Sequence, residues 1–406
     1  MRIVQIVYSV ESSGRAALRL HKGFSEVDIH SSIITLLPGS QADKNIHQMG
    51  KRAYFVGKAE YKIQNFLTRN TNKKLGLFTY PVLGADLAKL KIIKQADVIY
   101  LHWFLWGLLN LNHIEKLARL RKPIVIIMHD MWSITGGCHH SFDCEKYKTK
   151  CESCPVFKGK SFLDLAKSGF NKKNKLYTKY KNLFFVSPSK WLMDCTRHSF
   201  LTKDKQVYYI PNVIDSKKFK PLDKVFAKKV FNLKENTKVV VFGAVAVDSP
   251  YKGWAYLKQA LEILYKDSDF KDLSVIIFGS GGDEEMARSI PFETTFLGFM
   301  KDEYSMILVY NAADVFVAPS LADNQPTTVM ESLCCGTPVV GFHVGGIPDM
   351  IDHKINGYLA KYKDAADLAD GIKYCINNNL KGEILPHFQK EQVLSDHLQL
   401  IDNILK

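Results

Sequence analysis

The sequence predicts an α/β protein made of two doubly wound domains, each a parallel sheet with helices on both faces. Its 406 residues, 46% of them hydrophobic and 24% charged, exceed one ordinary domain and suffice for two buried cores. Apolar runs at 96–101, where Asp97 is the one charged residue, and at 124–128 and 315–317 are typical of central strands that are covered on both faces. A second series of strand and helix patterns begins at 208–215, which is therefore the expected linker. The expected boundaries are a first domain at 1–203, a second domain at 204–385 and a closing helical segment at 386–406.

The first domain opens with a strand at 2–8 that leads through the small-residue turn Ser12-Ser13-Gly14 into a helical pattern. A strand that passes through such a turn into a helix offers backbone N–H groups to a phosphate. Gly14 and Arg15 are therefore candidate phosphate contacts, and an ordinary turn with a surface arginine is the alternative. The last strand of this domain is expected at 183–186, followed by a helix at 190–198.

Two histidines directly follow central strands of the first domain. His102 comes after the run 96–101, and His129 comes after 124–128. Because ligands collect at the carboxyl ends of strands in open α/β sheets, both are candidate binding residues. The alternative is a core histidine whose hydrogen bonds are satisfied. Trp103 begins an aromatic cluster that stacks on a sugar, contacts lipid headgroups or belongs to the core.

The loop 135–155 gathers four cysteines: Cys138, Cys144, Cys151 and Cys154. Four thiolates suit a tetrahedral zinc ion with a structural role, although the first spacing is wider than in a standard zinc finger. Thiols without a metal, or redox-active thiols, are the alternatives.

The formal net charge of +14 indicates an anionic partner, such as a nucleotide sugar or an anionic membrane surface. No signature of nucleic-acid recognition accompanies the charge, so we expect no nucleic-acid partner. Eleven lysines between 146 and 181 form either a solvated helix face or a contact with the membrane surface. Neither a signal peptide nor an apolar run of spanning length is evident, so we expect a cytoplasmic protein, either free or peripheral on the inner face of the membrane.

In the second domain, strands are expected at 238–242 and 274–278, followed by Gly243 and Gly279. Glycines at strand ends let the backbone approach a nucleotide closely. Lys252 follows the first of these strands and is a compact cation that suits a diphosphate. A surface lysine is the alternative.

The stretch 315–348 carries the most specific pattern in the chain. A short strand is followed by Asp323 and, after a proline, by a helix that Thr327 or Thr328 can cap. The first turn of such a helix favours an anion, and Glu331 lies about one turn further on, where a carboxylate suits a ribose diol. An exposed loop aspartate and a solvated helix glutamate are the alternatives.

With seven residues between Asp323 and Glu331, the chain resembles family 4 glycosyltransferases of the GT-B fold, whose donor site is written E-x7-E. The resemblance extends to the segments CGTPVV and GG-IP that follow and to the strand-end histidine His129. It implies two Rossmann-like domains facing a central cleft, with the last helix crossing back to the first domain. Asp323 replaces the first glutamate of the family, which shortens its reach by one methylene. The cysteine loop is similar to TGGC…CP insertions in the colanic-acid and capsule branch, where they border the acceptor side.

In the family, the second carboxylate binds the ribose hydroxyls and the first faces the transferred sugar. The resemblance implies catalytic roles for His129, Asp323 and Lys252, and it places His102 and Trp103 on the acceptor side. The family's arginine beside the lysine is not evident here, which either weakens the diphosphate clamp or moves its charge to Arg15. The implied donor-binding residues are Gly14, Arg15, Gly243, Lys252, Gly279, Phe299, Asp323, Asn324, Gln325, Pro326, Thr327, Thr328 and Glu331.

The activity implied is transfer of a hexosyl group, with retention, from a nucleotide diphosphate sugar to a hydroxyl of a glycan acceptor. The acceptor is expected to be lipid-linked and the pathway to be cell-surface polysaccharide biosynthesis, with UDP sugars favoured over GDP sugars. No cofactor is required for this catalysis, so zinc would be structural only. A GT-B phosphorylase or synthase of soluble sugars is one alternative, and a non-catalytic protein that binds nucleotide sugar or membrane is the other.

Overall fold

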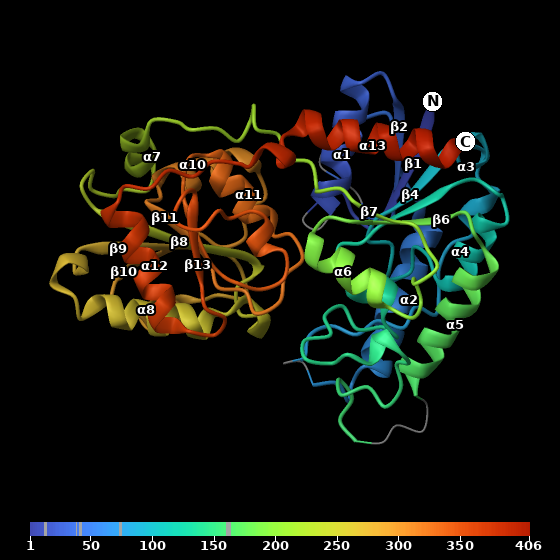
Figure 1. Cartoon of the computed structure of the whole chain (residues 1–406), viewed down its shortest axis with the longest axis horizontal. Coiled ribbons are helices and arrows are strands. Elements are labelled where there is room, and N and C mark those ends of the chain that lie inside the picture. Colours follow the sequence, from blue (N-terminus) through green and yellow to red (C-terminus); the bar gives the residue numbers. More distant parts are fainter. Residues whose placement is uncertain (12–13, 38, 40–42, 73–74, 160–163) are drawn as a thin grey trace. The chain divides into compact units, whose positions relative to one another are not determined.

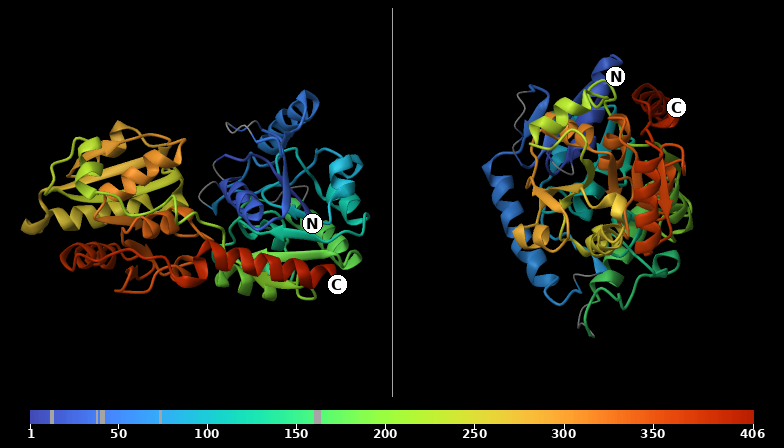
Figure 2. Two further views of the ribbon diagram at one scale, coloured as in Figure 1. Left: turned by 90° about the horizontal axis from the view of Figure 1, so that it is seen from above. Right: turned by 90° about the vertical axis from the view of Figure 1, so that its left-hand side faces the viewer.

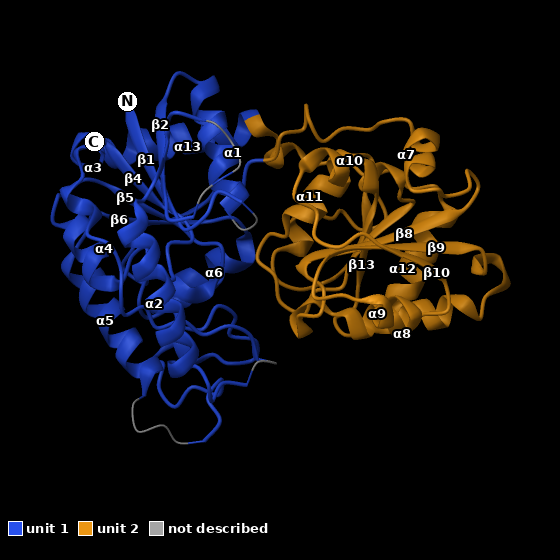
Figure 3. Cartoon of the chain, turned by 180° about the vertical axis from the view of Figure 1, so that it is seen from behind, with its two compact units in different colours: residues 1–213, 391–406 blue, residues 214–390 orange. Residues whose placement is uncertain are grey.

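The computed structural model describes residues 1–406 except 12–13, 38, 40–42, 73–74 and 160–163. Ser12 and Ser13 of the predicted phosphate turn therefore lie outside the described residues. The chain forms two compact units (Figure 3). Unit 1 comprises Met1–Val213 and Glu391–Lys406, and unit 2 comprises Ile214–Lys390.

Unit 1 is built on a seven-stranded parallel sheet with the order β3-β2-β1-β4-β5-β6-β7. Its strands are β1 Arg2–Val7, β2 His30–Thr35, β3 Ile46–Gln48, β4 Val98–Leu101, β5 Ile124–Ile127, β6 Leu183–Ser187 and β7 Val207–Tyr209. Successive residues of β4 enter two different cores: Val98 and Tyr100 pack in one, Ile99 and Leu101 in the other. This alternation, in a strand buried throughout, confirms the prediction of a central strand covered on both faces.

Helices flank this sheet on both faces (Figures 1 and 2). They are α1 Arg15–Glu26, α2 Lys51–Leu67, α3 Lys91–Gln95, α4 Leu111–Ala118, α5 Leu165–Lys179, α6 Lys190–His198 and α13 Lys390–Leu405. The helix predicted at 190–198 is thus confirmed as α6.

The prediction that 183–186 forms the last strand of the first domain is wrong. Phe185 of β6 pairs with Val207, so β7 extends the sheet by one more strand. All three residues of β7 are only half-buried, because an edge strand pairs on one side alone and needs no continuous apolar run. The passage between the units consequently falls at Val213–Ile214 rather than at 203–204, and the second passage falls at Lys390–Glu391 rather than at 385–386.

Unit 2 is built on a six-stranded parallel sheet with the order β10-β9-β8-β11-β12-β13. Its strands are β8 Lys238–Ala246, β9 Leu273–Ser280, β10 Glu293–Phe296, β11 Val315–Ala318, β12 Val339–Phe342 and β13 Gly357–Ala360. Its helices are α7 Lys224–Val230, α8 Trp254–Tyr265, α9 Glu284–Arg288, α10 Glu303–Ala312, α11 Thr327–Cys334 and α12 Ala365–Asn377. Two apolar cores again lie on opposite faces of the sheet.

Strand β8 of unit 2 extends beyond its predicted end. It continues past Gly243 to Ala246 with a shift in register against β9. The shift begins at a glycine, where the backbone departs from a regular ladder. Strand β10 ends at Phe296, so Phe299 follows that strand.

The last helix, α13, packs in unit 1, as predicted. The ring of His397 lies 5.8 Å from that of Phe24 and 5.7 Å from that of Tyr100. Gly23 of α1 has no room for a side chain, because an added Cβ would lie 2.7 Å from a methyl group of Leu394. Figures 1 and 2 show α13, in red, running along unit 1. Among the described residues, no helix combines the length and the apolar composition that crossing a membrane requires.

Candidate functional site

In unit 2, the loops that follow β8 and β11 meet at the carboxyl end of the sheet. Lys252 Nζ lies 2.6 Å from Asp323 Oδ2, and both side chains are largely buried, with 18% and 15% exposed. Ser320 Oγ donates to the same carboxylate oxygen over 3.3 Å. Burial acts to lower the pKa of Lys252, but the charge and hydrogen bond of Asp323 outweigh it and raise the pKa above 10.5. The structure thus brings two predicted site residues together as an ion pair.

Glycines allow these loops to approach so closely. Gly253 has φ +75°, and an added Cβ would lie 1.8 Å from Pro319 O. Gly345 has φ +58°, and its Cβ would lie 1.9 Å from Asp323 O. Gly346 N–H donates to that same oxygen over 3.1 Å. The GG-IP segment therefore supports the backbone that carries Asp323.

Helix α11 begins at Thr327, and Pro326 occupies its N-cap position. The prediction that Thr327 or Thr328 caps the helix is wrong, because both residues lie inside it. Pro326, at φ −64° and ψ +114°, takes the cap position but has no side-chain acceptor to offer. No side chain of the described residues caps α11, so the N–H groups of its first turn are directed at the loop with the positive end of the helix dipole behind them.

Glu331 is a buried carboxylate rather than a solvated helix residue. It is 1% exposed, and Tyr310 Oη of α10 donates to its Oε2 over 2.9 Å. The loop between β11 and α11 is buried as well, with Asn324 3% and Gln325 7% exposed. The alternative of an exposed loop and a solvated glutamate therefore does not describe this segment.

The two predicted strand-end glycines lie beside each other in β8 and β9. Gly243 pairs with Phe278, and an added Cβ would lie 2.1 Å from the ring of Phe278. Gly279 has φ +136°, and its Cβ would lie 2.0 Å from Ala244 O. Packing within the sheet therefore already requires glycine at both positions. Phe299, which follows β10, is 43% exposed.

In unit 1, the carboxyl ends of β4 and β5 bring His102 and His129 together. Their rings stack at 5.4 Å, and His102 Nδ1 lies 3.2 Å from His129 Nε2. On its other side, His102 Nε2 lies 2.8 Å from the side-chain amide of Gln5 on β1, which is fully buried. Sequence reasoning predicted both histidines but not Gln5.

The amide of Gln5 fixes the tautomers of both rings. Its orientation is assigned from its neighbours: Ala17 O can only accept and the backbone N–H of His21 can only donate, so the nitrogen is placed toward Ala17 O and His102 Nε2, and the oxygen toward the His21 N–H and Ser31 Oγ. Since His102 Nε2 is then an acceptor, the proton of that ring is on Nδ1 and is donated to His129 Nε2. His129 consequently carries its own proton on Nδ1. Burial lowers the pKa of His102 well below 6.5 and the pKa of His129 to about 4, so both rings are neutral near pH 7.

A second polar group beside these histidines was missed in the sequence. His139 Nδ1 lies 2.7 Å from Asp130 Oδ2, and His139 Nε2 lies 2.9 Å from Thr79 Oγ1. Burial acts to raise the pKa of Asp130, but the charge and hydrogen bond of His139 and the N–H of Trp132 outweigh it and lower the pKa. The only signal in the sequence was a histidine next to a cysteine in the loop 135–155.

Trp103 lies at the edge of this group. It makes edge-on contacts with Tyr8 at 5.6 Å and with Trp106 at 4.7 Å, and its ring is 6.3 Å from that of His139. Trp103 is half-buried, whereas Phe104 next to it is a core residue with 3% exposed. The aromatic cluster is therefore divided between the core and the surface that carries the histidines.

Gly14 and Arg15 lie at the start of α1 in unit 1. Gly14 is the N-cap residue, and an added Cβ would lie 1.5 Å from Ser9 O, so no larger residue fits the turn. Arg15 is the first residue of the helix and is half-buried. The other predicted donor-binding residues belong to unit 2.

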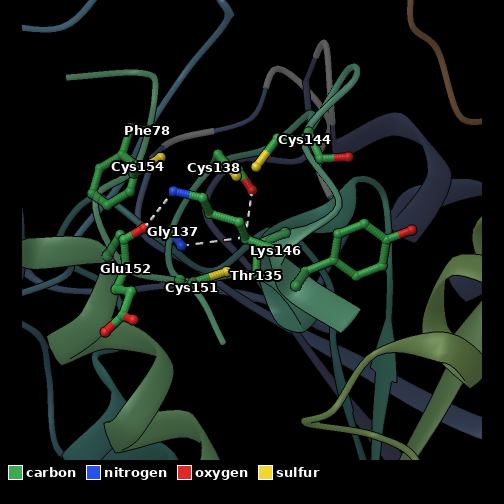
Figure 4. A pocket seen from close by; sticks show the side chains of 13 residues that line it. Phe78, Thr135, Gly137, Cys138, Cys144, Lys146, Cys151, Glu152 and Cys154 are labelled. Carbon is green, nitrogen blue, oxygen red and sulfur yellow. Dashed lines mark hydrogen bonds between the residues drawn. The ribbon is translucent and has the colours of Figure 1, made fainter. Parts of the chain in front are cut away.

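The four cysteines of the loop 135–155 line one small cavity in unit 1 (Figure 4). All four are free thiols. Within the described ranges, no three His, Cys, Asp or Glu side chains already surround one point as a bound metal ion requires.

Residues 236–378 match the family described as glycosyl transferases group 1. An uncharacterized glycosyltransferase of Methanocaldococcus jannaschii is 24% identical over 78% of this chain and 74% of its own length. WcaC of Escherichia coli K12, named as a candidate colanic acid biosynthesis glycosyl transferase, is 23% identical over 77% of this chain and 76% of its own length. An uncharacterized glycosyltransferase of Haemophilus influenzae is 28% identical, but the match spans only 37% of that protein's length and 32% of this chain.

Solved structures resemble the entire chain. A glycosyltransferase from Rickettsia africae superposes with a TM-score of 0.67 at 14% identity, over 100% of this chain and 98% of its own. Alr3699/HepE of Anabaena, solved in complex with UDP and glucose, has a TM-score of 0.61 at 16% identity, over 100% of this chain and 99% of its own. The chain therefore has the GT-B fold, and its residues 236–378 are similar to the domain described as glycosyl transferases group 1.

Proposed function

We propose that the protein is a retaining glycosyltransferase that moves a hexosyl group from a nucleotide diphosphate sugar to a hydroxyl of a glycan acceptor. UDP sugars are the favoured donors and GDP sugars the second choice. The UDP complex of the Anabaena structure supports a nucleotide donor, and the name of the Escherichia coli relative supports a role in surface polysaccharides such as capsule.

The observation that carries the proposal is the arrangement of Lys252, Asp323 and α11 at one sheet edge. A buried lysine that pairs with Asp323, shortly before a helix that no side chain of the described residues caps, suits a diphosphate. Asp323 holds the lysine in place at 2.6 Å and faces the transferred sugar. Glu331 is held by Tyr310 and takes the ribose hydroxyls. In this arrangement fixed protein groups, with no metal required, neutralise the leaving diphosphate.

His129 is proposed to contact the transferred sugar. Its ring is neutral near pH 7 because burial lowers its pKa to about 4, and its Nε2 accepts from His102. Its Nδ1–H is therefore the donor for a sugar hydroxyl, and the ring is not an acid in the reaction. No side chain is assigned as a covalent nucleophile; the leaving phosphate takes the acceptor's proton on the same face.

The proposed acceptor is lipid-linked, and the protein binds an anionic membrane surface through α2. This helix exposes Tyr54, Phe55, Tyr61 and Phe66, the two phenylalanines by 65% and 62%. Its lysines and arginine are exposed as well, while its one acid, Glu60, is fully buried and accepts from Gln64 and two backbone N–H groups. An exposed face with aromatic rings and cations but no carboxylate suits an anionic interface.

The lysine run at 146–181 is a weaker candidate for that contact. Several of its members are engaged locally: Lys150 and Lys167 pair with Glu152, and Lys179 pairs with Glu115. We therefore place the membrane contact on α2 instead of on the lysine run.

The test is binding and turnover across a panel of UDP and GDP sugars, measured by calorimetry and by release of the nucleotide with a lipid-linked glycan present. We expect one donor to bind, and we expect Lys252→Ala and Glu331→Ala to weaken it at least tenfold. Lys258→Ala and Glu262→Ala are matched controls, because both residues lie exposed on α8.

Equal binding by all four variants would overturn the proposed site. A requirement for free phosphate, with soluble sugars as acceptors, would indicate a phosphorylase or synthase instead. Normal cellular function of the Glu331→Ala variant would indicate a non-catalytic protein.

A further inference from the structure

The four cysteines of unit 1 form a thiol cluster that the proposed transfer reaction does not use. Cys138, Cys144, Cys151 and Cys154 share their cavity with Thr135 and Lys146. Figure 4 shows the four side chains around this cavity. Cys138 and Cys154 are already in hydrogen-bond contact with each other.

The surrounding backbone donates to the sulfur atoms. The N–H groups of Gly136 and Val156 donate to Cys151 and Cys154, respectively. Ser153, between these two cysteines, has φ +46°, a conformation that an L-residue adopts only where its surroundings demand it. N–H···S contacts from a tight C-x-x-C turn are the outer contacts that a metal-bound thiolate needs.

Two lysines lie beside the cluster. Lys173 is 1% exposed, its ammonium lies 3.5 Å from the ring centroid of Trp132, and it donates to the carbonyls of Trp132 and Thr135. Among the described residues, no carboxylate lies within ion-pair distance of Lys173; Asp130 acts on it only at longer range. Burial lowers its pKa to about 7, partly offset by Cys138 and Cys151. A buried ammonium of this kind favours negative charge nearby.

Lys146 supplies a second cation. It lines the same cavity and donates to Glu152 O and Ser153 O, both at 3.0 Å. Four thiolates around a divalent cation carry a net double negative charge. Lys146 and Lys173 act on these sulfur atoms at charge–charge range and offset part of that charge.

We propose that Cys138, Cys144, Cys151 and Cys154 bind one structural zinc ion. Because no three ligands already surround a common point in the described residues, binding requires the thiols to rotate about their Cα–Cβ bonds into the cavity. Each thiol that binds loses its proton to solvent, and no oxidant or reductant takes part.

The zinc ion would fix a loop that reaches the candidate site. Cys138 forms a β-bridge with Phe78, and the next residue, His139, holds Asp130 and Thr79. A metal at Cys138 therefore positions His139, although it takes no part in glycosyl transfer.

The test is metal analysis of the full-length protein purified under reducing conditions from zinc-supplemented cells. We expect one zinc per chain, lost in Cys151→Ser/Cys154→Ser and retained in the control Cys195→Ala/Cys375→Ala, whose cysteines lie outside the cavity. In case the serine variant fails to fold, the wild-type protein is also reconstituted with Co²⁺. Four thiolates then give an intense thiolate-to-cobalt charge-transfer band together with the visible bands of tetrahedral cobalt.

Three results would overturn the proposal. The first is zinc-free wild-type protein that gives no such cobalt spectrum. The second is a folded serine variant that keeps its zinc. The third is a Cys138–Cys154 disulfide found by mass spectrometry in protein kept under reducing conditions.

Discussion

Gln5 shows how one buried side chain sets the chemistry of residues far from it in the sequence. With its nitrogen facing His102 and its oxygen facing Ser31, it leaves only one proton arrangement for the His102–His129 pair. The donor that His129 presents, after β5, is thus set by a residue on β1, four strands earlier in the sequence. Gln5 is a positioning residue, since it does not itself face a substrate.

Replacing Gln5 by methionine should release the tautomer of His102. Loss of one buried neutral hydrogen bond costs about 1 kcal/mol, so we expect transfer to fall about fivefold with little change in donor affinity. Imidazole ¹⁵N shifts of His102 and His129 should change from a single tautomer to a mixture. The exposed Gln392→Met on α13 is the control, and unchanged imidazole shifts in Gln5→Met would contradict the assignment.

At this scale the sequence identified residues but not their partners. Asp323, Glu331 and Lys252 were predicted from local motifs, yet the 2.6 Å contact between Lys252 and Asp323 joins two loops that no motif connects. Gln5 could not be predicted, because a polar residue inside an apolar strand carries no sign of which ring it will face.

At the scale of elements, the turn into α8 determines where Lys252 lies. Gly253 is both the N-cap of α8 and a residue with φ +75°, and Pro319 O occupies the space of its missing Cβ.

Gly253→Ala should therefore destabilise unit 2 by about 1–3 kcal/mol and weaken donor binding by moving Lys252. Urea unfolding and donor calorimetry measure the two effects. Gly50→Ala at the start of α2 is the matched control, since nothing lies within 4 Å of its added Cβ. Equal stability of the two variants would show that the loop yields to the new methyl group.

Helix α2 gives a separate prediction for membrane binding. Phe55→Ser/Phe66→Ser should reduce sedimentation with vesicles of anionic phospholipid at least about tenfold, equivalent to roughly 1.4 kcal/mol, without changing the melting temperature. Phe226→Ser on α7, where the ring is 58% exposed, is the control. Binding that persists in the double variant would remove α2 as the contact.

Strands that form continuous apolar runs could be predicted from the sequence, whereas the short strands at the edges of the unit 1 sheet could not. β4, β5 and β11 are continuous apolar runs because both faces are covered. Strands β3 and β7 have only three residues each and pair with one neighbour. Because they are not enclosed by the sheet on both sides, their sequences do not need to be continuously apolar. The start of α11 could not be predicted to the residue, because a proline followed by two threonines fits either Pro326 or a threonine at the N-cap position.

At the scale of the whole molecule, the stability of unit 1 depends on keeping three histidines neutral. Burial lowers the pKa of His129 to about 4 and of His397 to about 3, and lowers that of His102 well below 6.5. In the unfolded chain these histidines bind protons as the pH falls below about 6.5. In the folded chain they stay neutral until the pH approaches their lower folded-state pKa values. Folding is therefore favoured above pH 6.5 and loses stability progressively toward pH 4 and below.

Denaturant unfolding across this pH range should show that loss, at up to about 1.4 kcal/mol per pH unit for each such histidine. His397→Leu should reduce the slope, because it removes one of the three groups. His198→Leu, which replaces an exposed histidine on α6, is the matched control for the loss of an imidazole. Identical slopes for both variants would show that His397 is protonated in the folded protein.

Because α13 packs in unit 1, the core of unit 1 can be completed only late in synthesis. Val393, Leu394, Leu400 and Ile401 complete a core whose other members, such as Phe24 and Tyr100, are translated before unit 2. A ribosome must therefore produce all of Ile214–Lys390 before that core can close. Until residues 390–405 leave the exit tunnel, the apolar residues that α13 covers stay exposed, and exposed apolar surface of this kind is prone to aggregation during folding.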